Sequence, residues 1–147
     1  MLIHYMLLFA LFAQSFGLFD FLFSWVGKKQ CVGAKGRIMC NGRSSYRVIV
    51  NLVDGDSMDF DDVMDKTRTD RDGYYQLYGC VNEVTTITPK VNIIHGCNAE
   101  SNWCPINLQK WIPLSYINSK IKSKTFHDFG VSELSHRSLD EVPACFS

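Results

Sequence analysis

The segment from Thr69 to Cys97 constrains the fold of this chain more than any other part of the sequence. It contains the pair Asp72-Gly73, followed by short runs in which apolar and polar residues alternate, and it ends on a cysteine. An Asp-Gly pair suits the tight turn between two strands, and alternation with a period of two is typical of a strand with one buried face. This segment therefore predicts a β-sandwich, and we expect it to be an extracellular one that functions by binding.

Strand-like runs with turn residues between them recur along the sequence. We expect strands over residues 32–40, 46–53, 64–69, 74–78, 90–97, 106–112 and 125–134. Apolar residues on both faces indicate a central position for the second run, and Asp72-Gly73 predicts a hairpin between the third and the fourth. Gly130 indicates a bulge, and the apolar spacing within 59–64 predicts a short helical turn. The sum is an all-β fold, an antiparallel two-sheet β-sandwich of about seven strands.

The amino-terminal segment has the character of a secretory signal. Residues 5–13 form an unbroken apolar run, and the first charged side chain is Asp20. Ser15 and Gly17 are small residues that suit a cleavage site, so we expect a signal peptide over 1–17. The apolar character resumes after Gly17, which leaves an uncleaved signal anchor as the alternative. We expect an N-terminal extension over 18–30, one domain over 31–147, and a secreted protein that associates with cell surfaces.

Charge and cysteine content narrow the class of protein further. Fifteen basic and fifteen acidic residues give a net charge of zero, so no overall field attracts nucleic acid. All six cysteines follow the expected cleavage site, and an even number in an exported domain favours disulfides over free thiols or zinc ligands. Six cysteines allow 15 pairings, and their count does not choose among them.

Several motifs together resemble the transthyretin-like family, which is abundant in nematodes. They are Gly36 to Gly42, Val48 to Leu52, Thr69 to Gly73, Thr85-Thr86-Ile87-x-Pro89 and His95-x-Cys97-Asn98. The last two are the most specific, because an Asp-Gly turn occurs in many hairpins. The resemblance covers roughly residues 33 to 145. It implies a secreted, disulfide-linked β-sandwich of the transthyretin type.

The resemblance also implies where the disulfides lie. Four cysteines fall where members of that family carry them: Cys40, Cys97, Cys104 and Cys145. Cys31 and Cys80 are then an additional pair. If the first strand lies antiparallel to residues 74–78, Cys31 comes within bridging distance of Cys80. We therefore expect the disulfides Cys31–Cys80, Cys97–Cys104 and Cys40–Cys145.

The function implied by the resemblance is binding rather than catalysis. We expect a non-enzymatic adaptor that contacts an extracellular protein, an anionic lipid or a glycan, without a cofactor and without stable membrane insertion. One alternative is a carrier of small hydrophobic ligands, as in vertebrate transthyretin, although the fold alone does not imply it. Another is an enzyme like the hydroxyisourate hydrolases of this fold, but those end in Tyr-Arg-Gly-Ser, whereas this sequence ends Ala144-Cys145-Phe146-Ser147.

Two features supply candidate binding residues. Lys120, Lys122 and Lys124 alternate, so in an extended segment their ammonium groups project to one side. Near an anionic membrane each lysine contributes about 1 kcal/mol, which predicts weak contact with a headgroup or glycan; a solvated loop or guarded edge strand is the alternative. Trp103 precedes Cys104 in a short loop that a disulfide would order, which predicts an interface anchor, with packing inside the fold as the alternative.

An acidic stretch raises the question of calcium. Eight carboxylates lie between Asp54 and Asp72. Their spacing does not match an EF-hand, which requires a glycine at position 59 and a glutamate at position 65. We expect a solvated acidic loop, with an irregular calcium site as the alternative.

Other histidine-containing patterns predict neither a metal site nor a catalytic base. His95 with Cys97 and Cys104 lacks a fourth zinc ligand, and an exported protein favours disulfides for the two cysteines. His127 and Asp128 are adjacent on a predicted strand, so their side chains point to opposite faces. The sequence contains no Gly-x-Ser-x-Gly, Walker or His-Glu-x-x-His motif.

Overall fold

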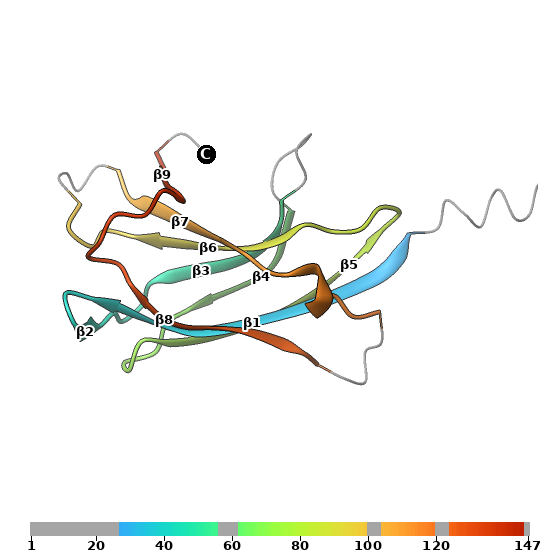
Figure 1. The fold of residues 1–147 in the computed structure, drawn as a ribbon, viewed down its shortest axis with the longest axis horizontal. Coiled ribbons are helices and arrows are strands. Elements are labelled where there is room, and N and C mark those ends of the chain that lie inside the picture. The colour runs from blue at the N-terminus through green and yellow to red at the C-terminus, as the bar shows by residue number, and fades with distance from the viewer. Residues whose placement is uncertain (1–26, 56–61, 100–103, 120–123, 146–147) are drawn as a thin grey trace, which may run out of the picture.

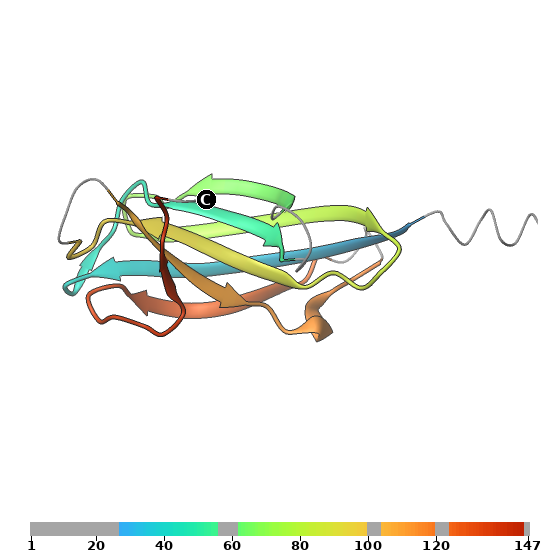
Figure 2. The ribbon, with the colours of Figure 1, turned by 90° about the horizontal axis from the view of Figure 1, so that it is seen from above.

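The structure is a computed structural model that describes residues 27–55, 62–99, 104–119 and 124–145. In these residues the fold is all-β, with two sheets packed face to face (Figure 1, Figure 2). The strands are β1 (Lys28–Cys40), β2 (Arg43–Ser44), β3 (Ile49–Asp54), β4 (Asp62–Arg68), β5 (Tyr74–Glu83), β6 (Pro89–His95), β7 (Ile106–Trp111), β8 (Phe126–Glu133) and β9 (Glu141–Pro143), and one 3-10 turn, η1, covers Leu114–Tyr116. No helix among the described residues is long and apolar enough to cross a membrane, and the predicted signal peptide lies outside them.

The first sheet, sheet A, is built around β1. β5 lies antiparallel along one edge of β1, β2 extends that edge, and β8 lies along the other edge. β8 runs parallel to β1, which departs from the purely antiparallel expectation. The parallel direction follows from the connection, because after η1 the chain returns to the start of β1, where Asn118 pairs with Cys31, and β8 begins from that end.

The second sheet, sheet B, is antiparallel throughout, in the order β4-β3-β6-β7-β9. β3 lies between β4 and β6, which confirms the central position predicted from its apolar residues. Val50 and Leu52 face the core, so Asn51 and Val53 lie on the opposite face of the sheet, where Val53 is nonetheless buried, at 2% exposure. Pro89 opens β6, where the missing N–H costs least.

The turn at Asp72-Gly73 forms, but it does not make the predicted hairpin. It connects β4 in sheet B to β5 in sheet A, so the two strands lie in different layers. The turn chemistry is as expected: Gly73 has a φ of 82°, and the Asp70 carboxylate accepts hydrogen bonds from the N–H groups of Asp72 and Tyr74. A Cβ at Gly73 would collide with the carbonyl oxygen of Ile38. The sequence therefore marks the turn but not the sheet to which the next strand belongs.

Other sequence expectations need smaller corrections. Val63 and Met64 belong to β4 and are not helical, while the earlier part of the predicted helical turn lies outside the described residues. β1 begins at Lys28, so the end of the predicted extension pairs with β5. The bulge in β8 is confirmed: Gly130 has a φ of 63°, and the β1–β8 register shifts between Lys35 and Arg37.

A single hydrophobic core lies between the two sheets. Its fully or nearly fully buried members are Val32, Ala34, Ile38, Val50, Leu52, Tyr75, Leu77, Ile87, Val91, Ile93, Leu108, Ile112 and Leu134. The core residues that lie on strands alternate with residues of the opposite face, as the period of two predicts. Truncating one of them to alanine costs about 2–5 kcal/mol of stability.

The structure pairs all six cysteines, but only one pairing is the expected one. Cys31 faces Cys80 across β1 and β5, with a Cα–Cα distance of 4.0 Å. The other two expected pairings are wrong, because the structure joins Cys40 to Cys97 and Cys104 to Cys145. The reason is β9, which was not predicted. It pairs with β7, and just after it the Ala144 N–H donates a hydrogen bond to the Pro105 carbonyl, so Cys145 lies beside Cys104.

Candidate functional site

The outer face of sheet A is the candidate binding surface. Three cross-strand rows, each centred on β1 and flanked by β5 and β8, form this face. They are Tyr74–Arg37–Val131, Gln76–Lys35–Asp128 and Tyr78–Gly33–Phe126. Tyr74 and Val131 are 53% and 59% exposed, so apolar surface remains open to solvent beside the charges.

A hollow of about 500 Å³ lies in this face, between the first two rows. It coincides with the bulge of β8, where Gly130 takes its positive φ. Gly36 makes room beneath it, because a Cβ there would lie 2.9 Å from the Tyr75 hydroxyl and 3.1 Å from the Gly130 carbonyl oxygen. The glycines therefore allow Tyr75, which comes from the core, to form part of the lining.

The Tyr75 hydroxyl has no hydrogen-bond partner among the described residues, although the residue is only 5% exposed. Burial raises the pKa of Tyr75 well above its usual value, and the nearby Asp128 carboxylate raises it further. The hydroxyl therefore stays protonated at physiological pH and keeps its hydrogen to donate. Buried polar groups without a partner are uncommon in folded proteins.

Charged side chains of both signs surround the hollow, and several are held in place. Arg37 donates from Nε to the Asp72 carbonyl at 2.9 Å and from Nη2 to the Ser44 hydroxyl at 3.0 Å. Its guanidinium carbon lies 5.2 Å from the centre of the Tyr74 ring.

Lys35 and Asp128 form an exposed ion pair at 3.5 Å. Hydrogen bonding from Gly130 N–H, and then Lys35, lowers the pKa of Asp128.

A second cation–aromatic pair lies at the other end of the face. Lys124 Nζ lies 5.0 Å from the centre of the Tyr78 ring, whose centroid is 5.8 Å from that of Phe126. Lys124 thus joins this surface, whereas Lys120, Lys122 and Trp103 lie outside the described residues and remain predictions.

Sequence reasoning missed Arg37, Tyr74 and Tyr78 as members of one surface. The usable signal was the alternation of outward residues on β1 and β5, which the Cys31–Cys80 pairing places in register.

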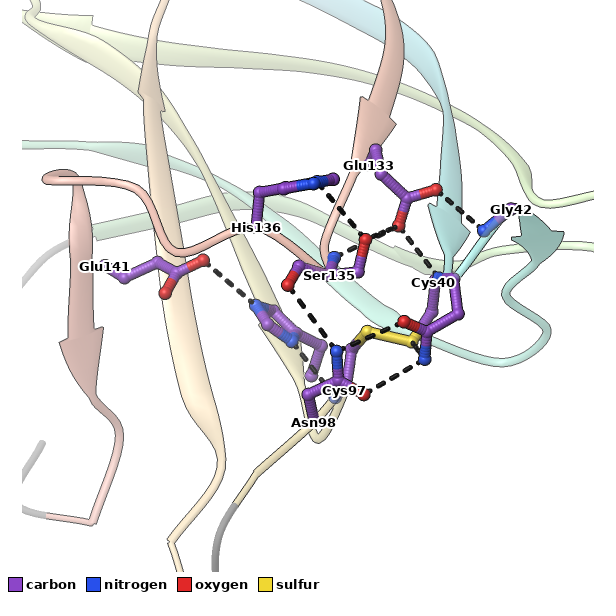
Figure 3. Close-up of a disulfide and its surroundings, with 10 residues drawn as sticks. Cys40, Gly42, Cys97, Asn98, Glu133, Ser135, His136 and Glu141 are labelled. Atoms are coloured by element: carbon purple, nitrogen blue, oxygen red, sulfur yellow. Dashed lines mark hydrogen bonds and ion pairs between the residues drawn. A yellow bond between two sulfur atoms is a disulfide. The ribbon is translucent and has the colours of Figure 1, made fainter.

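The end of the sandwich at Cys40–Cys97 contrasts with this open face (Figure 3). Glu133 accepts hydrogen bonds from the N–H groups of Gly42 and Ser135, from the Ser135 hydroxyl and from Asn41 N–H. These donors, with the Ser135 hydroxyl foremost, lower the pKa of Glu133 to about 2. Asn98 and Asn41 exchange side-chain hydrogen bonds at 3.0 and 3.2 Å.

His95 is buried beside this disulfide. Its Nδ1 accepts a hydrogen bond from Cys97 N–H at 3.2 Å, which places the ring proton on Nε2. Nε2 lies 4.0 Å from Glu141 Oε1, and the two side chains are 2% and 5% exposed. Desolvation lowers the pKa of His95, against a raising effect of Glu141. His95 therefore orients the backbone at Cys97 as a neutral side chain.

The structure also tests the two histidine-containing patterns, His95 with its neighbouring cysteines and His127 beside Asp128. Cys97 and Cys104 are both in disulfides, so neither offers zinc a thiolate beside His95. His127 packs against Tyr116 and Phe129, away from Asp128, as predicted for neighbours on a strand.

The acidic stretch is described in part. Asp65 and Asp70 accept backbone N–H groups, including those of Tyr78 and Tyr74. Asp56, Asp59 and Asp61 lie outside the described residues, so an irregular calcium site there stays a prediction.

Comparison with known proteins agrees with the fold. The model of the Transthyretin-like family matches residues 35–113. Transthyretin-like protein 5 of Caenorhabditis elegans is 36% identical over 113 residues, covering 76% of this chain and 81% of that protein. Transthyretin-like protein 2 of the same organism is 30% identical over 129 residues, covering 84% of this chain and 87% of that protein. With more than half of its length matched by the family model, the chain belongs to the transthyretin-like family.

Proposed function

We propose that this protein is a secreted, non-enzymatic adaptor whose contact surface is the outer face of sheet A. The observation that carries the proposal is the placement of two cation–aromatic pairs, Arg37–Tyr74 and Lys124–Tyr78, on either side of a hollow. Tyrosine and arginine are enriched among the residues that dominate protein interfaces. Tyr74 and Tyr78 are four residues apart on β5, which is roughly 13 Å along a strand.

The charges of this face favour an extracellular protein as the partner over an anionic lipid. The hollow is lined by Lys35 and Arg37, but also by Asp70 and Asp128. A surface that attracts anionic headgroups gains from each cation and loses from each carboxylate. A protein partner, which carries both signs, can pair with both kinds of group.

The disulfides support the proposed export. Disulfides persist in oxidising compartments and are rare in the cytosol. Cys31–Cys80 joins neighbouring strands of sheet A, and Cys40–Cys97 joins sheet A to the segment after β6. Recovery of the native protein from the culture medium of producing cells, with all six cysteines oxidised, would support export; recovery from the cytosol with free thiols would refute it.

A matched pair of surface variants tests the contact face. Val131 on sheet A and Val63 on sheet B are both 59% exposed, so aspartate at either position perturbs the fold similarly. We expect Val131→Asp to reduce binding of the oxidised protein to a panel of extracellular receptor domains, and Val63→Asp to leave it unchanged. Equal binding by both variants would contradict the proposal. Binding to anionic phospholipid vesicles, but to no protein of the panel, would replace the partner class by a lipid.

A further inference from the structure

The outer face of sheet B carries a row of uncharged amide side chains. In the antiparallel register Asn92 lies between Asn51 and Gln109, and Asn107 lies in the next row beside Ile94. Val50, Leu52, Val91 and Ile93 face the core, so these amides face outward. Cross-strand neighbours on one face are about 5 Å apart, so the four amides are contiguous over β3, β6 and β7, with Asn92 buried (7% exposed) and the other three partly exposed. We call this group the carboxamide patch.

Two members of the carboxamide patch have unused hydrogen-bonding capacity. The side-chain oxygens of Asn51 and Asn107 are shielded by their neighbours, yet accept no hydrogen bond from the described residues. Most shielded polar atoms in folded proteins have a partner, so each exception calls for an explanation. Within the part of the chain that the structure describes, no hydrogen bond fixes the orientation of these two oxygens. Rotation of a carboxamide therefore offers a ligand either an acceptor or a pair of donors.

An exposed aromatic ring borders the carboxamide patch. Trp111 lies two residues after Gln109 on β7, on the same face, and is 54% exposed. Lys90 Nζ lies 5.2 Å from the ring centre, and a Cβ at Gly55 would lie 3.0 Å from two ring atoms. The indole is thus packed against backbone and a lysine stem on one side and open on another.

We propose that this face of sheet B binds a neutral glycan. A sugar ring has an apolar C–H face that stacks on an indole, and hydroxyl groups at its edge that both donate and accept hydrogen bonds, as carboxamides do. The carboxamide patch itself carries no formal charge. The cations of this face border it: Lys66 and Arg68 lie on the edge strand β4, and the buried Lys90 lies beside Trp111. An uncharged, hydroxyl-rich chain therefore complements the amides.

The same chemistry argues against two other occupants. A lipid tail or an apolar protein surface would cover the amide groups without pairing them, and a buried polar group left unpaired is unfavourable. A second copy of this chain would bring apolar Ile49 and Ile94 into contact, but it would also bury its own amides. The inference does not rest on the proposed function, because the two surfaces are on opposite sheets.

The test is a titration of the full oxidised protein with chitohexaose and, separately, cellohexaose, followed by calorimetry and by tryptophan fluorescence. We expect saturable binding to at least one of them. Trp111→Ala should weaken it by about tenfold or more, since the stacking surface is lost. Gln109→Ala, a milder surface change, should weaken it by about threefold to tenfold. Tyr46→Ala, at an aromatic residue 56% exposed and outside the carboxamide patch, is the matched control and should bind as the unchanged protein does.

Three results would overturn the inference. One is the absence of heat and of a fluorescence change with both oligosaccharides at millimolar concentration. The second is binding that Trp111→Ala and Gln109→Ala both leave intact while they remain folded. The third is a concentration-dependent dimer in the absence of glycan that Trp111→Ala dissociates, because the face would then be a self-association surface. Salt-sensitive binding of heparin alone, lost on Lys66→Ala with Arg68→Ala, counts with the first result.

Discussion

The cross-linked end at Cys40–Cys97 and the hollow on sheet A use polar side chains in opposite ways. At the cross-linked end, one carboxylate, Glu133, satisfies donors from two turns, and Asn41 and Asn98 pair with each other. At the hollow, the Tyr75 hydroxyl has no partner among the described residues, and the Lys35–Asp128 pair is about half exposed. The first arrangement fixes the chain, while the second leaves hydrogen-bonding capacity for another molecule.

This difference teaches where stability and binding are separable. Hydrogen bonds and ion pairs completed within the chain contribute to the free energy of unfolding. Surface groups without a partner contribute to the free energy of binding, once another molecule supplies the complementary group. Substitutions at the two regions should therefore affect different measurements.

The largest expected effect comes from removing the disulfide at the cross-linked end. Cys40→Ala with Cys97→Ala opens a loop of 57 residues, which in the chain-entropy model lowers the free energy of unfolding by up to about 4 kcal/mol. Urea denaturation measures the loss, and partner binding by the folded fraction should not change. A double variant as stable as the unchanged protein would show that the Cys40–Cys97 disulfide contributes nothing to the free energy of unfolding.

The next effect concerns binding at the hollow. Tyr74→Ala removes an exposed ring and the support of Arg37, so we expect partner affinity to fall by about 2 kcal/mol, roughly thirtyfold. Stability should change by about 0.5 kcal/mol or less, as is usual at a surface position. Partner affinity and the urea midpoint together distinguish a binding role of Tyr74 from a structural one. A loss of stability with unchanged affinity would show that Tyr74 stabilises the fold and is not part of the contact surface.

The fold was predictable from sequence where it depends on local chemistry. The period of two predicted the core residues of β1 and β3, Gly130 predicted the bulge, and Cys31–Cys80 followed from two strands whose direction was expected. The predictions that were wrong concern contacts between residues distant in sequence. Asp72-Gly73 marks a turn, yet packing between sheets decides whether the next strand continues one layer or starts another.

The same limit explains the two wrong disulfides and the incomplete site. β9 has three residues, too few for a periodic signal, and its pairing with β7 is what brings Cys145 to Cys104. In the candidate site, Lys124 stood out as part of a lysine row. Arg37 and Tyr74 did not, because an isolated arginine and tyrosine become a cation–aromatic pair only in the register of β1 with β5.

A smaller effect, at the cross-linked end, depends on pH. Burial holds the pKa of His95 below its ordinary value of 6.5 in the folded state, so below that pH the unfolded chain binds more protons. Stability should be constant above about pH 7 and fall by at most about 1.4 kcal/mol per unit as pH drops through 6.5.

The matched variant for this pH prediction is His95→Asn. It keeps an acceptor near the Cys97 N–H and removes the titration, so its stability should depend less on pH between 7 and 5. Identical pH profiles for the two proteins would remove His95 as the cause. Below pH 4.5 the depressed pKa of Glu133 adds a further loss in both proteins, because its carboxylate becomes protonated in the unfolded chain first.

The smallest effect separates the two ends of the sheet A face. Lys124→Ala removes the cation over Tyr78, and at an exposed site such a contact contributes about 0.5–1 kcal/mol, so affinity should fall about twofold to fivefold. Lys124→Arg keeps the cation and should restore most of it. If binding instead falls with rising salt as steeply for Lys124→Ala as for the unchanged protein, Lys124 contributes no charge to the contact, and the partner docks on the Arg37–Tyr74 end alone.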